Sequence, residues 1–383
     1  MSPIQRLLSK LYWRSDDELQ RLSQRGVKPF LELVVHEEAT AWSRFEMPLG
    51  RRVWLWRHGF ISQADVLYDV DERTRHRYLS SYQRELTRPI NGQWRTALQN
   101  KLLFHRLLQP FDAHRSTVHG HLHRGQFTAV DAPESDSNGE AKNANDRTTD
   151  SVARVKEYLT SANRLVLKPI YGVSGNRVLI CSVTDGSYSV NGEERSEREF
   201  EELVASLDGY LVCEYVEQAD YADDLFRDSS NTIRVLTMWD PDTDEPFIAD
   251  AVHRIGTERS APRDNWSRGG LSAAIDRSTG RLGEGVQYPY DGSLEWHSTH
   301  PETGNAIAGS EVPGWEAVKE KLTALAGRFP QIPYVGWDIV VTDPGEFTVI
   351  EGNTCSGVRV FQVHRPLLAD PRVRRFYEHH DVI

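Results

Sequence analysis

The amino-acid sequence predicts an α+β protein with a mainly helical N-terminal region. Two observations lead to this prediction: apolar residues recur at helical spacing in the first hundred or so residues, and short strand and helix patterns follow one another beyond residue 152. A third observation concerns size, because a chain of 383 residues exceeds what one hydrophobic core usually supports. We therefore expect two or three lobes, with room for a cleft.

The N-terminal region is expected to contain two helical stretches. IQRLLSKLYW (residues 4–13) and TALQNKLLFHRLLQPF (residues 96–111) place apolar residues along one helix face. RRVWLW (residues 51–56) is expected to be a short extended piece. The polar stretch 131–151 is rich in Ser, Asn and Asp, so it cannot build a core and is expected to be a flexible linker or loop.

Beyond this linker, the patterns predict a small α+β lobe followed by a larger one. The expected elements are a helix at 152–159, a strand at 164–168, a glycine loop, a strand at 177–181, a helix at 197–206, strands at 210–216, 231–240 and 246–254, a helix at 315–329, a hairpin at 335–353 and a helix at 370–380. We place the domain boundaries at 1–130 for the N-terminal region, 131–151 for the linker, 152–216 for the small lobe and 217–383 for the large lobe.

Composition limits the cellular setting and the partners. The chain has 45 Lys and Arg against 56 Asp and Glu, a net charge of −11, and no dense basic stripe, which argues against nucleic acid as a partner. Three cysteines without paired zinc spacing fit a reducing cytoplasm. No apolar run has the length of a membrane helix, and the N-terminus has no signal-peptide core, so we expect a cytoplasmic protein without membrane insertion. The sequence does not indicate an oligomeric state.

The stretch VGWDIVVTDPGEFTVIEGN (residues 335–353) predicts a β-hairpin around a Pro-Gly turn. A symmetric hairpin sets Asp338 directly opposite Glu351, and alternation along the strand puts Asn353 on the same face. Opposed like charges destabilise a sheet, and a cation between them relieves the repulsion. Three oxygen donors suit Mg²⁺ or Mn²⁺. The alternative is a solvated hairpin whose acids face water.

A glycine loop gives a second candidate site. RLVLKPIYGVSGNRVLI (residues 164–180) places Lys168 at the end of an apolar strand and Gly172, Ser174 and Gly175 in the following loop. Glycines let backbone N–H groups approach a phosphate closely, and the lysine adds a positive charge. We expect a phosphate-covering flap, although an ordinary hairpin with a lysine at its edge fits the same residues. A strand follows the loop, so the segment is neither a P-loop nor a dinucleotide fingerprint.

Two later strands carry further candidates. LVCEYVEQAD (residues 211–220) is apolar until Glu214 and then becomes acidic, which is typical of a strand end. NTIRVLTMW (residues 231–239) places Arg234 among apolar strand residues, where an unpaired guanidinium would be costly. We expect an anionic partner for Arg234: a phosphate, a substrate carboxylate or a neighbouring Asp.

The order of these signals resembles the ATP-grasp superfamily. More narrowly, four segments look like the sugar-transfer-associated ATP-grasp proteins: NTIRVLT (231–237), DNWSRGGLSAAID (264–276), VGWDIVVT (335–342) and IEGN (350–353). The resemblance covers roughly residues 90 to 365. It implies an ATP-grasp fold, in which two α+β lobes enclose ATP and Mg²⁺ bridges its phosphates.

The resemblance implies roles for the nucleotide-binding candidates. Lys168 would contact the phosphates, and Gly172 to Gly175, with Ser174 among them, would close over them. Lys101 resembles the lysine that precedes the nucleotide lobe, although a surface helix lysine fits equally well. The residues expected to line adenine are Glu214, Tyr215 and Val216, and the acid that binds ribose stays open among Glu217, Asp220, Asp223 and Asp224.

The resemblance also implies where chemistry takes place. Asp338, Glu351 and Asn353 would hold one or two Mg²⁺ ions. The expected catalytic residues are Lys168, Arg234, which would steady the transferring phosphate or the acceptor, and Arg268. Arg268 is expected to lie near the acceptor together with Asn265, Gly269 and Gly270, where glycines permit a close backbone approach.

The reaction that such a cleft implies is ATP-dependent formation of an amide or peptide bond from a small-molecule carboxylate and an amine. ATP would first phosphorylate the carboxylate, and the amine would then displace phosphate from the acyl phosphate. The product could belong to a glycan, a peptide or a small metabolite. Two alternatives use the same cleft: a phosphotransferase that phosphorylates a hydroxyl or similar acceptor, and a nucleotide-binding module without turnover.

Overall fold

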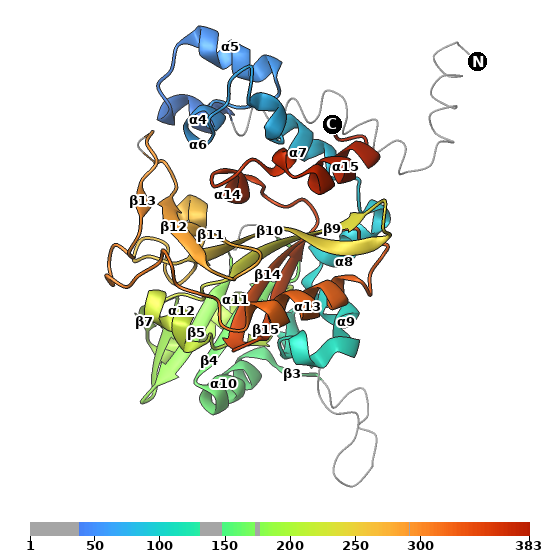
Figure 1. The fold of residues 1–383 in the computed structure, drawn as a ribbon. Coiled ribbons are helices and arrows are strands. Elements are labelled where there is room, and N and C mark those ends of the chain that lie inside the picture. Colours follow the sequence, from blue (N-terminus) through green and yellow to red (C-terminus); the bar gives the residue numbers. More distant parts are fainter. Residues whose placement is uncertain (1–37, 131–147, 173–176, 291) are drawn as a thin grey trace, which may run out of the picture.

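The structure, a computed structural model, describes residues 38–130, 148–172, 177–290 and 292–383 (Figure 1). The helix expected at 4–13 lies outside these ranges, as do residues 131–147 of the expected linker. The described chain forms a helical N-terminal region, two antiparallel sheets and a group of C-terminal helices.

Short helices make up the described N-terminal region, which confirms its mainly helical character. They are α4 (Ala39–Arg44), α5 (Leu49–Arg57), α6 (Ala64–Leu67), η2 (Arg75–Arg77), α7 (Ser81–Leu86), η3 (Gly92–Trp94), α8 (Arg95–Gln99), α9 (Lys101–Leu107) and η4 (Gln109–His114). The helical stretch expected at 96–111 is confirmed with breaks at Asn100 and Leu108. Asn100 causes the first break, because its side chain caps α9 by accepting hydrogen bonds of 3.0 Å from the backbone N–H groups of Leu102 and Leu103.

The prediction of an extended piece at 51–56 is wrong, because these residues belong to helix α5. Tertiary contacts override their strand propensity: Arg52 and Leu55, three residues apart on one helix face, are both buried. Arg52 pairs with Glu38 at 3.1 Å and donates to Ser62 Oγ at 2.7 Å. Burying this ion pair and Leu55 on one face requires helical spacing.

The first sheet has eight strands in the order β3-β2-β1-β8-β4-β5-β6-β7. Their bounds are β1 (Val118–His123), β2 (Gln126–Ala129), β3 (Thr148–Asp150), β4 (Arg164–Pro169), β5 (Leu179–Thr184), β6 (Ser187–Val190), β7 (Glu193–Arg195) and β8 (Tyr210–Glu214). Helices α10 (Ser151–Ala162) and α11 (Glu197–Ser206) share a hydrophobic core with this sheet, through Val155 and Phe200 among others. The predicted helices at 152–159 and 197–206 are therefore confirmed.

This sheet takes strands from both sides of the expected linker. Strands β1 and β2 precede residue 131, and β1 pairs with β8. Thr148–Asp150 form β3, and Ser151 begins α10, so the end of the expected linker is structured. The small-lobe sheet thus reaches back to Val118, and the domain boundaries at 130 and 151 stay a prediction.

The second sheet has seven strands in the order β13-β12-β11-β10-β9-β14-β15. Their bounds are β9 (Ile233–Asp240), β10 (Glu245–Ile255), β11 (Leu271–Ile275), β12 (Leu282–Gln287), β13 (Trp296–His297), β14 (Tyr334–Asp343) and β15 (Glu346–Asn353). The remaining helices are α12 (Asp220–Leu225), η6 (Trp266–Arg268), α13 (Trp315–Ala326), α14 (Arg359–Gln362), η7 (Leu367–Ala369) and α15 (Pro371–His379). The strands and helices expected in this half are confirmed.

A hydrophobic core covers each face of the second sheet, so the core that a strand residue joins shows on which face its side chain lies. One core joins Ile233 and Val235 to α13 and to Phe104 of α9. The other core joins Leu236 and Met238 to α14, α15 and the N-terminal helices, which lie above the sheet in Figure 1. Arg234 alternates with Ile233 and Val235, so its side chain points away from the first core.

The predicted hairpin is confirmed, and Asp338 does lie opposite Glu351. The hairpin is not regular, however. Ile350 is an extra residue on β15 and Thr342 an extra residue on β14, and these two irregularities offset each other. The symmetric register is therefore restored at the acidic pair.

The architecture confirms an α+β protein with two sheet-containing lobes behind a helical N-terminal region. Strand β8 of the first sheet leads through residues 215–219 into α12 and the second sheet. None of the described helices combines the length and the apolar character needed to cross a membrane.

Candidate active site

A row of charged side chains crosses three neighbouring strands of the second sheet. Arg234 on β9 is the backbone partner of Asp338 on β14, and Asp338 is the partner of Glu351 on β15. Directly paired residues project from the same face of a sheet, so these three side chains form one row. The anionic partner expected for Arg234 is therefore a neighbouring Asp in this structure.

Arg234 and Asp338 form a buried two-point ion pair. Arg234 Nη2 donates to Asp338 Oδ2 at 2.9 Å, and Arg234 Nε donates to Oδ1. Burial acts to raise the pKa of Asp338, but the guanidiniums of Arg234 and Arg254 outweigh it and hold that pKa below its ordinary value. The carboxylate is therefore ionised at neutral pH.

Arg254 and Asp264 belong to the same cluster and were missed by the sequence reasoning. Arg254 Nη2 lies 3.4 Å from Asp338 Oδ2, and Arg254 Nε lies 3.4 Å from Asp264 Oδ2. Thr232 accepts from Arg254 Nε at 3.0 Å, and its backbone N–H donates to Asp264 at 2.8 Å. The signal was present, because Arg254 interrupts the apolar strand AVHRI as Arg234 interrupts NTIRVLT.

Asn353 lies beside this row, as expected. Its Nδ2 donates to the Gly336 carbonyl at 3.1 Å and lies 3.4 Å from Asp338 Oδ2. Within the described part of the chain, its amide oxygen has no hydrogen-bond partner. Gly336 also lets Ser356 pack closely against β14, because a Cβ at position 336 would lie 2.5 Å from Ser356 Oγ. The buried Ser356 hydroxyl has no hydrogen-bond partner among the described residues.

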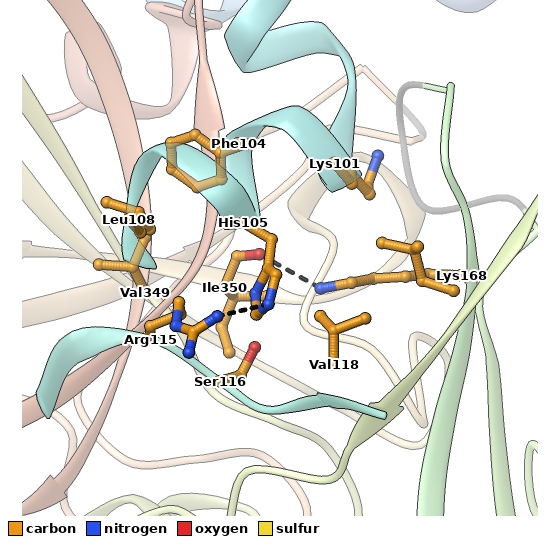
Figure 2. A pocket seen from close by; sticks show the side chains of 11 residues that line it. Lys101, Phe104, His105, Leu108, Arg115, Ser116, Val118, Lys168, Val349 and Ile350 are labelled. Carbon is orange, nitrogen blue, oxygen red and sulfur yellow. Dashed lines mark hydrogen bonds between the residues drawn. The ribbon is translucent and has the colours of Figure 1, made fainter. Parts of the chain in front are cut away.

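Two lysines reach the hairpin from outside the second sheet. Lys101, at the start of α9, lies 3.6 Å from Glu351 Oε2 and donates to the Gly172 carbonyl at 3.0 Å. Lys168, on β4 of the first sheet, reaches toward the Ile350 carbonyl, 3.5 Å away, as Figure 2 shows. The structure thus brings both predicted lysines to the strand that carries Glu351.

A small cavity marks the place where the two lobes meet (Figure 2). It encloses about 20 Å³, enough for about one water molecule. Its lining residues come from α9 and the segment that leads from it to β1, from the first sheet, and from β15 of the second sheet. They are Lys101, Phe104, His105, Leu108, Arg115, Ser116, Val118, Lys168, Leu211, Val349 and Ile350. Arg115 Nη1 donates to His105 Nε2 at 2.6 Å, so the His105 ring accepts at this nitrogen.

The flap is described only at its base. Gly172 is exposed with φ +146°, while Ser174 and Gly175 lie outside the described residues. The start of α9 supports this base: Lys101 N donates to the Ile170 carbonyl at 2.9 Å, and Asn100 Nδ2 donates to Tyr171 Oη at 2.7 Å. The role of the flap stays a prediction.

The residues expected at adenine lie at the end of β8 and in the connection that follows it. The Glu214 carboxylate accepts from the Thr117 backbone N–H at 2.7 Å, so it fastens β8 to the segment before β1. The Arg164 guanidinium stacks 3.5 Å from the Tyr215 ring centroid and pairs with Glu217 at 3.3 Å. Val216 follows Tyr215 and is half-buried.

Arg268 lies on the expected acceptor loop, outside the charged row. It ends helix η6, is exposed, and has Arg263 as a charged neighbour. At Gly270 the backbone packs closely within the loop, because a Cβ there would lie 2.6 Å from the Asp264 carbonyl oxygen. The expected approach of these glycines to an acceptor stays a prediction. Gly269 has φ +123°, a conformation that favours glycine.

The predicted metal ligands supply two carboxylates and one amide oxygen. Across the described ranges, no three His, Cys, Asp or Glu side chains gather in one metal-binding group. Protein sites for Mg²⁺ usually offer one or two carboxylates and leave the other positions to water and phosphate. The donor set of Asp338, Glu351 and Asn353 therefore fits Mg²⁺.

Fold and site together define the class of protein. A family model described as sugar-transfer associated ATP-grasp matches residues 81–375. The chain therefore belongs to this ATP-grasp family, and its two sheet-containing lobes are those of the ATP-grasp fold. No curated protein matches the chain at a significant level.

Solved structures with a similar fold include two ligases. The ATP-grasp ligase PsnB, solved with its minimal precursor, is 14% identical over 76% of this chain and 63% of PsnB, with a TM-score of 0.38. The D-alanine-D-alanine ligase from Coxiella burnetii is 13% identical over 74% of this chain and 59% of the ligase, with a TM-score of 0.34. The match thus spans less than two thirds of either solved chain.

Proposed function

We propose that this chain is an ATP-dependent carboxylate–amine ligase that acts through an acyl phosphate. Membership of the ATP-grasp family supports ATP as the nucleotide and a ligase reaction in general terms. The finer proposal rests on one observation: two lysines reach the strand that carries Glu351 of the row Arg234–Asp338–Glu351, Lys101 from α9 and Lys168 from the first sheet. Asn353 lies beside this row.

The charges of the cleft suit a nucleotide triphosphate. Lys101, Lys168, Arg234 and Arg254 contribute four cationic side chains near three acids, Asp264, Asp338 and Glu351. A Mg²⁺ ion held by Asp338, Glu351 and Asn353 would neutralise phosphate charge there. Lys168 and Lys101 would bind the outer phosphates, and Arg234 would bind the group that is transferred.

The reaction requires positioning rather than a protein nucleophile. A carboxylate oxygen of the substrate attacks the γ-phosphorus, and the bond to the bridging oxygen breaks so that ADP leaves with the electron pair. The amine then attacks the acyl carbon, phosphate leaves, and the nitrogen loses its proton to water. Fixed cations that stabilise the developing charge account for the acceleration.

The test is trapping of the acyl phosphate with hydroxylamine. The protein is incubated with ATP, Mg²⁺, hydroxylamine and a panel of amino acids, peptides and sugar acids. A hydroxamate formed together with an equal amount of ADP supports the ligase proposal. A stable phosphorylated acceptor would instead indicate a phosphotransferase, and no ADP with any member of the panel would indicate a nucleotide-binding module.

A further inference from the structure

We propose that an arginine–tyrosine cluster beside the expected acceptor loop binds an acidic group, a carboxylate or a phosphate, that the substrate carries away from its reacting group. The cluster consists of Arg44, Arg259, Tyr288 and Tyr290. This inference rests on the proposed function and deepens it, because it names an acidic substrate and gives the N-terminal helical region a part in binding that substrate.

Arg259 lies between Tyr290 and the expected acceptor loop. Its guanidinium carbon lies 3.7 Å from the centroid of the Tyr290 ring. Its side chain also packs on Gly269, where a Cβ would lie 2.7 Å from Arg259 Cγ. Stacking uses the flat face of a guanidinium and leaves the N–H donors in its plane for an anion. The loop and the ring therefore hold a donor group at the edge of the expected acceptor site.

The N-terminal region brings Arg44 to the same tyrosines. Arg44 ends helix α4, and Gln63 of the same region donates to the Tyr288 hydroxyl. The centroids of the Tyr288 and Tyr290 rings lie 5.3 Å apart. Burial raises the pKa of Tyr290, and the positive charges of Arg259 and Arg44 act against this rise. Both guanidiniums therefore lie close enough to act on the Tyr290 hydroxyl.

The two arginines of the cluster are not neutralised by acids of the described chain. Arg44 and Arg259 are exposed, and neither forms an ion pair with any residue that the structure describes. Elsewhere in the second sheet, by contrast, Arg365 pairs with Asp250. The chain as a whole has a net charge of −11, so two uncompensated cations beside one pair of tyrosines form a local site for an anion.

The Tyr290 hydroxyl points to a missing partner. Its oxygen is shielded from solvent and has no hydrogen-bond partner among the described residues. A shielded hydroxyl without a partner costs free energy. A shift of the exposed Arg44 or Arg259 side chain would admit an anion, to which this hydroxyl would donate. One bound carboxylate or phosphate would then satisfy the hydroxyl and both guanidiniums.

A stacked surface arginine without any ligand is the competing explanation. Modification of arginines by phenylglyoxal, followed residue by residue by mass spectrometry of peptides, separates the two explanations. Wild type is modified in chloride, in inorganic phosphate and in succinate at one ionic strength, without nucleotide. Arg57 is the control within the same sample, because it is exposed and ends α5 as Arg44 ends α4.

Phosphate or succinate should slow the modification of Arg44 and Arg259 at least about fivefold relative to chloride, and that of Arg57 less than about twofold. Protection by phosphate identifies a phosphate group as the ligand, and protection by succinate identifies a carboxylate. Equal modification of Arg44 and Arg259 in all three salts would overturn the site. Equal protection of Arg57 would show a general effect of the anion and would also overturn it.

Three variants test whether one anion contacts the whole cluster. Arg44→Gln should reduce the protection of Arg259 at least about threefold, whereas Arg57→Gln should leave it unchanged. Tyr290→Phe keeps the stacked ring and removes the hydroxyl. It should reduce the protection less than Arg44→Gln, because a neutral hydrogen bond contributes less than a charge-assisted one. Full protection of Arg259 in Arg44→Gln would overturn the binding of one anion by both arginines.

The connection to the substrate is tested in the hydroxylamine assay with pairs of carboxylates, such as glutamate and glutamine, that differ by one acidic group. Wild type should use the more acidic member at least about fivefold better in kcat/KM, and Arg44→Gln should lose this preference while Arg57→Gln keeps it. Equal use of both members by wild type would overturn the connection. Absence of hydroxamate with every carboxylate would refute the proposed function, while the modification experiment decides the anion site independently.

Discussion

Arg234 and Asp338 are paired both as backbone neighbours across β9 and β14 and as a side-chain ion pair, with Arg234 Nη2 2.9 Å from Asp338 Oδ2. Arg254 approaches the same carboxylate at 3.4 Å. The guanidiniums therefore neutralise Asp338, and a Mg²⁺ ion at Asp338 would share the carboxylate with them. Asp338 thus counters buried cations, and in the proposed site it would also supply a metal ligand.

The substitution Asp338→Asn is expected to impair both stability and activity. It leaves two largely buried guanidiniums facing a neutral amide, so the free energy of unfolding should fall by about 3–5 kcal/mol, as for other broken buried pairs. ADP formation should be lost even under conditions where the variant is folded. Urea unfolding and an ADP assay measure the two effects.

Asp240→Asn is the matched control, because Asp240 is a buried acid at the far end of β9 and pairs with Arg372. The stability of the Asp240→Asn variant should also fall, while ADP formation by the folded variant is retained. Near-normal ADP formation by Asp338→Asn would contradict the proposed role of Asp338.

Glu351→Gln is expected to separate activity from stability. Glu351 is half-buried, and among the described residues it forms one ion pair, with Lys101 at 3.6 Å, so the substitution should change the free energy of unfolding by less than about 1 kcal/mol. Turnover should fall at least about 100-fold, because a charged metal ligand is lost. Glu346→Gln, at the other end of β15 and paired with Lys321, should leave turnover unchanged. Turnover in Glu351→Gln close to that of wild type would argue against the metal assignment.

Lys168→Met is expected to weaken ATP binding without unfolding the protein. Among the described residues, Lys168 makes one polar contact, 3.5 Å to the Ile350 carbonyl, so little protein stability depends on its charge. Loss of one charge-assisted contact to phosphate should raise the KM for ATP about tenfold. Lys321→Met, which removes a surface lysine on α13, is the control and should leave KM unchanged. An unaltered KM in Lys168→Met would remove Lys168 from the proposed nucleotide site.

The acidic pair could be predicted because its register depends on features visible in the sequence. The Pro-Gly turn and the alternation of apolar residues set Asp338 against Glu351. The irregularities at Thr342 and Ile350 could not be predicted, because they depend on how the hairpin packs against the rest of the sheet. The prediction was right since the two extra residues lie on opposite strands and offset each other.

Other parts of the site depend on long-range contacts that one sequence does not contain. Arg254 and Asp264 are ten residues apart in the chain, and their shared partner Thr232 lies in a third segment. Outside the site, the segment 51–56 contains Val and Trp, which favour a strand, but the ion pair of Arg52 with Glu38 belongs to a buried helix face. In each case tertiary burial decided the outcome, and local propensity did not.

Two buried histidines are expected to make the protein sensitive to mild acid. Burial lowers the pKa of His253 to about 4, and burial together with the charge of Arg365 lowers the pKa of His364 to about 3. His253 Nε2 accepts from Tyr221 Oη at 3.0 Å, and its Nδ1 lies 3.1 Å from the Arg254 carbonyl, contacts that suit a neutral ring. Both histidines are therefore neutral in the folded protein at pH values where they would be protonated in the unfolded chain.

The sign of the effect follows from proton binding. Below an ordinary histidine pKa of about 6.5 the unfolded chain binds protons that the folded chain does not, so stability is present above this value and is lost as the pH falls toward 4. Each histidine should contribute a slope of about 1.4 kcal/mol per pH unit within that window. Urea unfolding at half-unit steps from pH 7.5 to pH 4.5 measures the slope. His253→Gln and His364→Gln should each flatten it by about half, and a wild-type stability that stays constant between pH 7 and pH 5 would contradict the prediction.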